Sequence, residues 1–301
     1  MAKQKRKLNI NLKPLIKRLE SITKRKVKTR LMGNYASVFR GTGGFEFEGY
    51  REYTLNDDAS MIDWKASARA NKLLVKVLRQ ERALEVFFLV DVSESMIFGS
   101  TTKLKNEYSA ELIGTLAFAI SAAGDKFGFA TFSNKVSNIL PPSRGINHFY
   151  RLCKILTNPD VYGGNCNFVE ALDFALSYVK RRSTLVFFVS DFVGLKGEWE
   201  KKLKLLCSKC DVVMIMIRDP RDETLPEDTN LVLVEDPYSK RRLIIDPKLI
   251  KHHYESYVKR EENSLREAFI RAGADFLKLS TAENFITPLV GFFIRRRRKW
   301  R

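Results

Sequence analysis

A run of five apolar residues, Val86–Val90, stands directly before an acid, Asp91, and two serines at alternate positions, Ser93 and Ser95. The run is too short for a helix and predicts a strand that is buried on both faces. Such a strand places Asp91 at its carboxyl end, which is where ligands bind in an open α/β sheet. A short loop rich in oxygen ligands suits a hard divalent cation, magnesium above all. The alternative is that these side chains bond only to nearby backbone N–H groups.

Strands and helices alternate along the rest of the chain. The predicted helices cover residues 103–123, 168–179 and 198–207, and the predicted strands cover residues 127–132, 184–189, 212–217 and 274–279. A second fully apolar strand, Thr184–Val189, is also followed by an acid, Asp191. This alternation is typical of a parallel sheet with crossover helices on both faces. The fold class is therefore predicted as α/β, with a doubly wound, mostly parallel, Rossmann-like sheet.

Three motifs precede the Asp91 strand, and a fourth contains its end. They are EFEGYREY at residues 46–53, DDASMIDWKASAR at 57–69, LLVKV at 73–77 and FLVDVSESMIFG at 88–99, followed by Lys103. In this order they resemble domain-of-unknown-function (DUF) family fifty-eight, whose members carry a von Willebrand factor A-like (vWA) domain. The resemblance covers roughly residues 36–240 and implies a vWA fold.

The resemblance and the charge pattern together divide the chain into four parts. We expect a basic N-terminal segment at residues 1–35, a small N-terminal subdomain at 36–84, the vWA-like domain at 85–294 and a basic tail at 295–301. Within the subdomain, Arg51 is expected to pair with one of the neighbouring acids and Trp64 to pack, so that this block braces itself. The alternative is that the same block forms a partner surface. The C-terminal part is predicted to hold a strand pair, a long helix from Pro247 to about Ala272 and a docking helix from Phe285 to Ile294.

The resemblance also implies a metal-ion-dependent adhesion site (MIDAS). In vWA domains this site joins a D-x-S-x-S loop, a threonine from a second loop and an aspartate after a later strand. Asp91, Ser93 and Ser95 match the first loop, and Asp191 matches the last position. The expected cofactor is magnesium, with manganese as the alternative, and the expected ligand is an exposed carboxylate of a protein partner.

The second loop departs from the family pattern. Cys166 falls at the threonine position, with one extra residue between it and Gly163-Gly164. A thiol is a poor magnesium ligand because hard cations prefer oxygen. Three alternatives stay open: Asn165 or Asn167 supplies an amide oxygen, a water fills the gap, or the site is weakened.

The same residues argue against an enzyme. A hydrolase with Asp91 as its nucleophile would want an acid two residues on, but that residue is Ser93. A serine nucleophile would need a base, and none of the three histidines is expected near a strand end. We therefore expect a non-enzymatic adaptor, and the family resemblance implies that it works with a MoxR-type AAA+ ATPase in protein or complex assembly.

Nearly all of the net charge of +18 lies at the two ends of the chain. Residues 1–30 hold twelve Lys or Arg and one acid, and residues 295–301 hold six Lys or Arg and no acid. Such ends can bind nucleic acid or an anionic membrane weakly, which is the alternative function, or can simply be solvated. No apolar run reaches the roughly 18 residues of a membrane span, and no signal peptide is apparent, so we expect a cytoplasmic protein. Cys207 and Cys210 are expected to be structural thiols.

Overall fold

The computed structural model describes residues 45–54, 57–80, 85–179, 184–226 and 230–299, so the predicted segment at residues 1–35 lies outside the described residues. A central sheet of six strands has the order β10-β7-β6-β3-β4-β5, and every neighbouring pair except β4 and β5 is parallel. This confirms the predicted doubly wound α/β class. The strand bounds are β3 Glu85–Asp91, β4 Lys126–Phe132, β5 Val136–Ser143, β6 Thr184–Ser190, β7 Asp211–Arg218 and β10 Asp275–Ser280.

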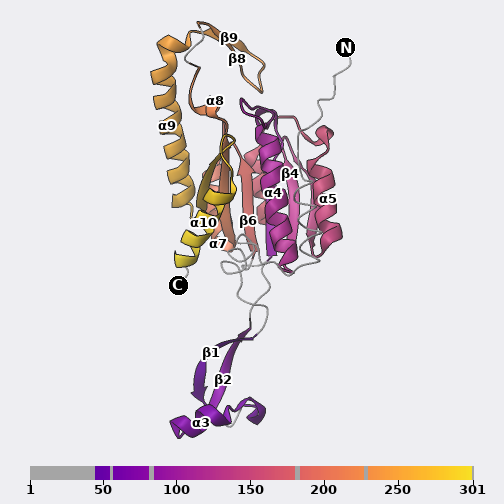
Figure 1. Ribbon diagram of the computed structural model, residues 1–301, viewed down its shortest axis with the longest axis vertical. Coiled ribbons are helices and arrows are strands. Elements are labelled where there is room, and N and C mark those ends of the chain that lie inside the picture. The colour runs from indigo at the N-terminus through magenta and orange to yellow at the C-terminus, as the bar shows by residue number, and fades with distance from the viewer. Residues whose placement is uncertain (1–44, 55–56, 81–84, 180–183, 227–229, 300–301) are drawn as a thin grey trace.

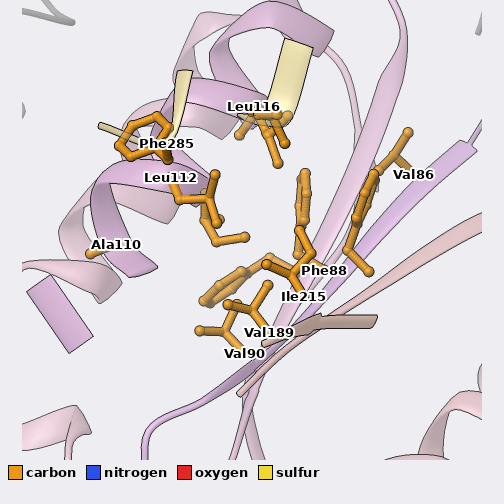
Figure 2. Packing of buried hydrophobic residues seen from close by; sticks show 14 of the residues in the cluster. Val86, Phe88, Val90, Ala110, Leu112, Leu116, Val189, Ile215 and Phe285 are labelled. Atoms are coloured by element: carbon orange, nitrogen blue, oxygen red, sulfur yellow. The ribbon is translucent and has the colours of Figure 1, made fainter. Parts of the chain in front are cut away.

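Helices cover both faces of this sheet (Figure 1). The first face carries α4 (Lys105–Ala122), α5 (Ile146–Leu156) and α10 (Ile286–Lys299), and the second carries α6 (Phe168–Tyr178), α7 (Trp199–Lys209) and the end of α9 (Pro247–Arg271). Successive side chains of a strand point to opposite faces. Val86, Phe88 and Val90 of β3 therefore enter the first core, which Figure 2 shows against α4, whereas Phe87 and Leu89 enter the second. Burial on both faces explains why β3 reads as an unbroken apolar run.

A small unit precedes the sheet and lies beyond one end of it (Figure 1). It consists of the antiparallel pair β1 (Phe45–Glu52) and β2 (Leu74–Gln80) and the short helix α3 (Trp64–Ala70). Arg51 forms an ion pair with Asp57, as the bracing interpretation predicts. Asp63 caps α3 and accepts a hydrogen bond of 3.0 Å from the Tyr50 hydroxyl. The expectation that Trp64 packs is wrong, because its side chain is 67% exposed.

The chain after β7 supplies the parts that lie nearest the predicted site. A short helix, α8 (Pro220–Glu223), follows β7, and an antiparallel hairpin of β8 (Val232–Glu235) and β9 (Arg242–Ile245) leads into α9. In Figure 1 this hairpin lies beyond the end of the sheet opposite to the β1–β2 unit.

The C-terminal helix is longer than predicted. Helix α10 continues to Lys299 instead of ending at Ile294, so residues 295–299 of the predicted tail are helical. Arg296 is buried and forms ion pairs with Asp211 and Asp275 at the amino ends of β7 and β10. The buried Arg296 therefore anchors α10 to the sheet. The number of charges in residues 295–301 could not reveal this contact. No helix within the described ranges combines the length and the apolar character needed to cross a bilayer.

Candidate metal centre

The four residues of the predicted ligand set lie together at the carboxyl end of the sheet. Strands β3 and β6 are parallel neighbours in register, so Asp91 at the end of β3 and Asp191 just after β6 emerge at the same edge. Ser93 and Ser95 follow on the loop and the short 3-10 turn Glu94–Met96. Asp91, Ser93 and Asp191 are 0% exposed and Ser95 is 4% exposed. Polar groups this deeply buried need partners, and each of them has some.

Asp91 is held by hydrogen bonds that bring no positive charge. Its Oδ1 accepts the backbone N–H of Ser93 at 2.8 Å, and its Oδ2 accepts the hydroxyl of Ser190 at 2.6 Å. Burial and then the neighbouring charge of Asp191 raise the pKa of Asp91 to about 6. The pKa is raised because burial disfavours the charged form and because a second negative charge lies close by.

Asp191 differs because it has a cationic partner. The ammonium of Lys105, at the start of α4, lies 2.8 Å from Asp191 Oδ2 and 2.9 Å from Asp222 Oδ2. Although burial opposes the effect, Lys105 lowers the pKa of Asp191. Oδ1 of Asp191 accepts the backbone N–H of Val193 at 3.2 Å. Lys105 therefore acts as a fixed cation on one side of the site.

The two serine hydroxyls are covered by a tyrosine from the β8–β9 hairpin. Tyr238 donates its hydroxyl to Ser95 Oγ at 2.9 Å and lies 3.4 Å from Ser93 Oγ, while the two serine oxygens are 3.3 Å apart. Burial raises the pKa of Tyr238 well above its usual value, so the phenol keeps its proton and can donate it.

The glycine-containing second loop reaches the site through its backbone and one thiol. Glu94 donates its N–H to the carbonyl of Gly164 at 2.9 Å, which ties this loop to the serine loop. The Cys166 thiol lies beside Asp91 and Ser190, and burial followed by the negative charge of Asp91 raises its pKa. Asn167 is exposed and its side chain caps α6, and Asn165 is exposed as well. Of Asn165, Cys166 and Asn167, only Cys166 lies at the carboxylates, and as a neutral thiol it offers no oxygen.

The donor set fits a hard cation better than zinc. Within the described ranges, no three His, Cys, Asp or Glu side chains are arranged to hold a metal ion. Any metal at this edge would therefore take serine hydroxyls together with carboxylate oxygens, which is the chemistry that magnesium and manganese prefer. Asp191 and Asp222 share the ammonium of Lys105, and Arg218 adds positive charge near Asp191, whereas Asp91 is held by neutral donors. A cation bound beside Asp91 would compensate its buried charge.

None of the three histidines is a hydrogen-bond partner of Ser93 or Ser95 in the described part of the chain. His148 on α5 bonds through Nε2 to the carbonyl of Phe127 at 2.9 Å, near the amino end of β4. His252 and His253 lie on the outer part of α9 and are exposed. No imidazole base is therefore brought to Ser93 or Ser95.

Three important residues of this region were not singled out from the sequence. Lys105 carried a usable signal, since a lysine in the first turn of a buried helix opposes the helix dipole and needs an acidic partner. Asp219 follows β7 just as Asp191 follows β6, and it accepts hydrogen bonds from Ser100 N at 2.8 Å and Thr281 Oγ1 at 2.9 Å. Tyr238 had no local signal because it lies 143 residues from Ser95.

Two solved structures resemble this one. An aerotolerance-related membrane protein from Bacteroides fragilis is 14% identical, with a TM-score of 0.50 over 72% of this chain and 99% of that chain. A von Willebrand factor type A structure from Catenulispora acidiphila is 9% identical, with a TM-score of 0.44 over 74% of this chain and 43% of that one. At such low identity, only the fold of the first structure bears on this chain.

Relatives in sequence cover nearly the whole chain. The uncharacterized proteins Rv1480 of Mycobacterium tuberculosis and Mb1516 of Mycobacterium bovis are each 27% identical over 287 residues, which is 94% of this chain and 89% of the relative. The family model described as "Protein of unknown function DUF58" matches residues 49–264. The vWA-like chain described above therefore belongs to the DUF58 family.

Proposed function

We propose that this protein is a non-catalytic interaction domain that binds an acidic side chain of a partner protein through a divalent cation. Ser93 and Ser95 would hold the cation directly, and Asp91 and Asp191 would hold it directly or through water. When bound, the cation would supply an open coordination position for a carboxylate oxygen. The Lys105 ammonium would keep Asp191 ionised and in place.

One observation carries this proposal: two buried carboxylates at the ends of neighbouring strands and two buried hydroxyls from the loop after β3 converge at the carboxyl end of the sheet, and neutral donors hold the Asp91 carboxylate. Structural hydrogen bonds alone do not require so many oxygens, because an apolar edge of the same shape would avoid the cost of burying Asp91. A vWA-like fold in the DUF58 family agrees with an interaction role.

The partner that the family resemblance implies is a MoxR-type AAA+ ATPase. We propose that binding to it depends on the same site, and that the two proteins cooperate in assembling other proteins or complexes. An ATPase surface that binds here should present an Asp or Glu, because a carboxylate matches the open position of a hard cation.

Calorimetric titration of magnesium and of manganese at low salt tests the metal site. We expect the wild type to bind one ion and Asp91→Asn to bind none. Asp173→Asn is the matched control, since Asp173 is an exposed acid that pairs with Lys202 on the outside of α6. Absence of binding both by the wild type and by Tyr238→Phe, which frees the serine oxygens from the tyrosine hydroxyl, would overturn the proposal. Pull-down of the ATPase with and without chelator then tests the partner separately.

A further inference from the structure

We propose that the β8–β9 hairpin is a lid on the metal centre, and that Tyr238 occupies the position that a partner's carboxylate must take. The inference rests on the proposed function and adds a way of regulating it. In the closed form the serines are satisfied from within the chain. A partner binds only when its acidic side chain replaces the tyrosine hydroxyl.

The contact between the lid and the site is made of three hydroxyl groups. Tyr238, Ser93 and Ser95 form a closed triangle with oxygen separations of 2.9, 3.3 and 3.4 Å. The Tyr238 hydroxyl therefore contacts both serine oxygens, and both serines are buried. An incoming ligand therefore cannot approach the serine oxygens from the hairpin side without moving Tyr238.

The tip of the hairpin holds Tyr238 in one orientation. The Asp236 carboxylate accepts the backbone N–H groups of Tyr238 and Ser239, each at 2.8 Å, which fixes the turn. Lys240, in the left-handed conformation with φ of 58°, completes the tip and forms an ion pair of 3.3 Å with Glu94 beside the serines. These hydrogen bonds hold the tip in one conformation, so it can move relative to the sheet as a rigid body.

Little apolar burial resists movement of this hairpin. None of the described residues of β8 or β9 is buried, and Leu233, Leu243 and Ile244 are more than half exposed. A two-stranded hairpin without a buried face is only marginally stable, and local opening is cheapest where few apolar contacts are lost. The Lys240–Glu94 pair is exposed, so it adds little to the closed form.

The chemistry of the two competing groups gives the lid its selectivity. The tyrosine offers a neutral hydroxyl, whereas a partner's Asp or Glu offers a charged oxygen that binds a divalent cation far more strongly. The closed lid therefore opposes binding of the metal alone. Binding of the metal together with a carboxylate displaces Tyr238 and opens the lid. The two ligands are expected to bind cooperatively.

Manganese titration on three chains tests the lid: wild type, Tyr238→Phe, which removes only the hydroxyl, and Tyr238→Ala, which also removes the ring. Tyr257→Phe on α9 is the control, because that tyrosine is exposed and far along the chain from the tip. If the lid is closed in nine-tenths of the molecules, freeing the site tightens the apparent Kd about tenfold. Binding by the variants alone would support the lid equally well.

Hydrogen exchange of residues 232–245 provides a second readout on the unaltered protein. Exchange should quicken when manganese and propionate, a simple carboxylate, are added together, and less with manganese alone. Equal manganese affinity of wild type and both variants, with unchanged exchange, would overturn the lid and leave the metal site standing. Failure of all chains to bind manganese would overturn the metal site and the lid together.

Discussion

Lys105 Nζ lies 2.8 Å from Asp191 Oδ2, and both side chains are almost completely buried. The same ammonium lies 2.9 Å from Asp222 and 5.6 Å from the centre of the Phe98 ring. The arrangement joins the start of α4 to the loops that follow β6 and β7. A buried charge that is shared in this way is costly to leave unpaired, so Lys105 affects both the stability and the charge of the site.

Replacing Lys105 tests that role. Lys105→Met should lower the free energy of unfolding by about 3–5 kcal/mol in chemical denaturation, because the buried Asp191 and the partly buried Asp222 lose their cation. Magnesium should restore part of the loss, since a divalent ion supplies the missing charge. Lys202→Met is the control: its pair with Asp173 is partly exposed, and the change should be about 1 kcal/mol or less. A magnesium effect no larger than in the wild type would contradict the view of Lys105 as a fixed cation.

We expect Asp219 to stabilise the loops at the carboxyl end of the sheet. Its carboxylate accepts hydrogen bonds from Ser100 on the loop after the serines, from Arg221 N in α8 and from Thr281 after β10. Asp219→Ala removes the acceptor of all three donors, of which Thr281 is buried, so we expect a loss of about 1–3 kcal/mol by the same denaturation measurement. Asp219→Asn should lose less because it keeps one acceptor oxygen. Equal stability of Asp219→Ala and wild type would refute this role.

Parts of the fold that depend on local pattern could be predicted from the sequence. Val86–Val90 is apolar without a break because β3 is buried on both faces, and Asp91 follows because the strand ends there. The same reasoning applies to Asp191 after β6. Parallel pairing of the two strands then brings both acids to one edge with no further information.

The remaining parts depend on contacts between distant residues. Tyr238 reaches Ser95 across 143 positions, and Lys105 reaches Asp222 across 117. Arg296 looked like part of a solvated basic run, yet it is buried against two acids on strand ends. In each case the neighbouring residues in the sequence do not identify which distant residue is the partner, because the packing of whole elements places these long polar side chains.

The stability of the metal-free chain should depend on the protonation of Asp91. The pKa of this carboxyl is 3.8 in an ordinary environment and about 6 in the folded chain, so the folded state holds the proton more tightly. That contribution favours folding at low pH and is lost as pH rises from 3.8 to about 6. Thermal midpoints of wild type and Asp91→Asn, compared between these values, should show the wild type losing stability relative to the variant. A constant difference would count against the raised pKa.

Cys166 gives the most direct test of how the site treats a hard cation. Its thiol stands beside Asp91 where the family resemblance places a threonine, and burial keeps it protonated by raising its pKa. Cys166→Thr and Cys166→Ser replace the sulfur with a hydroxyl oxygen, which hard cations prefer, so magnesium affinity in calorimetry should rise about tenfold or more. Cys153→Ser is the matched control, because Cys153 is a buried thiol of α5 in the opposite core. Weaker magnesium binding by both Cys166 variants would mean that the site is adapted to the thiol itself, and that its cation is softer than magnesium.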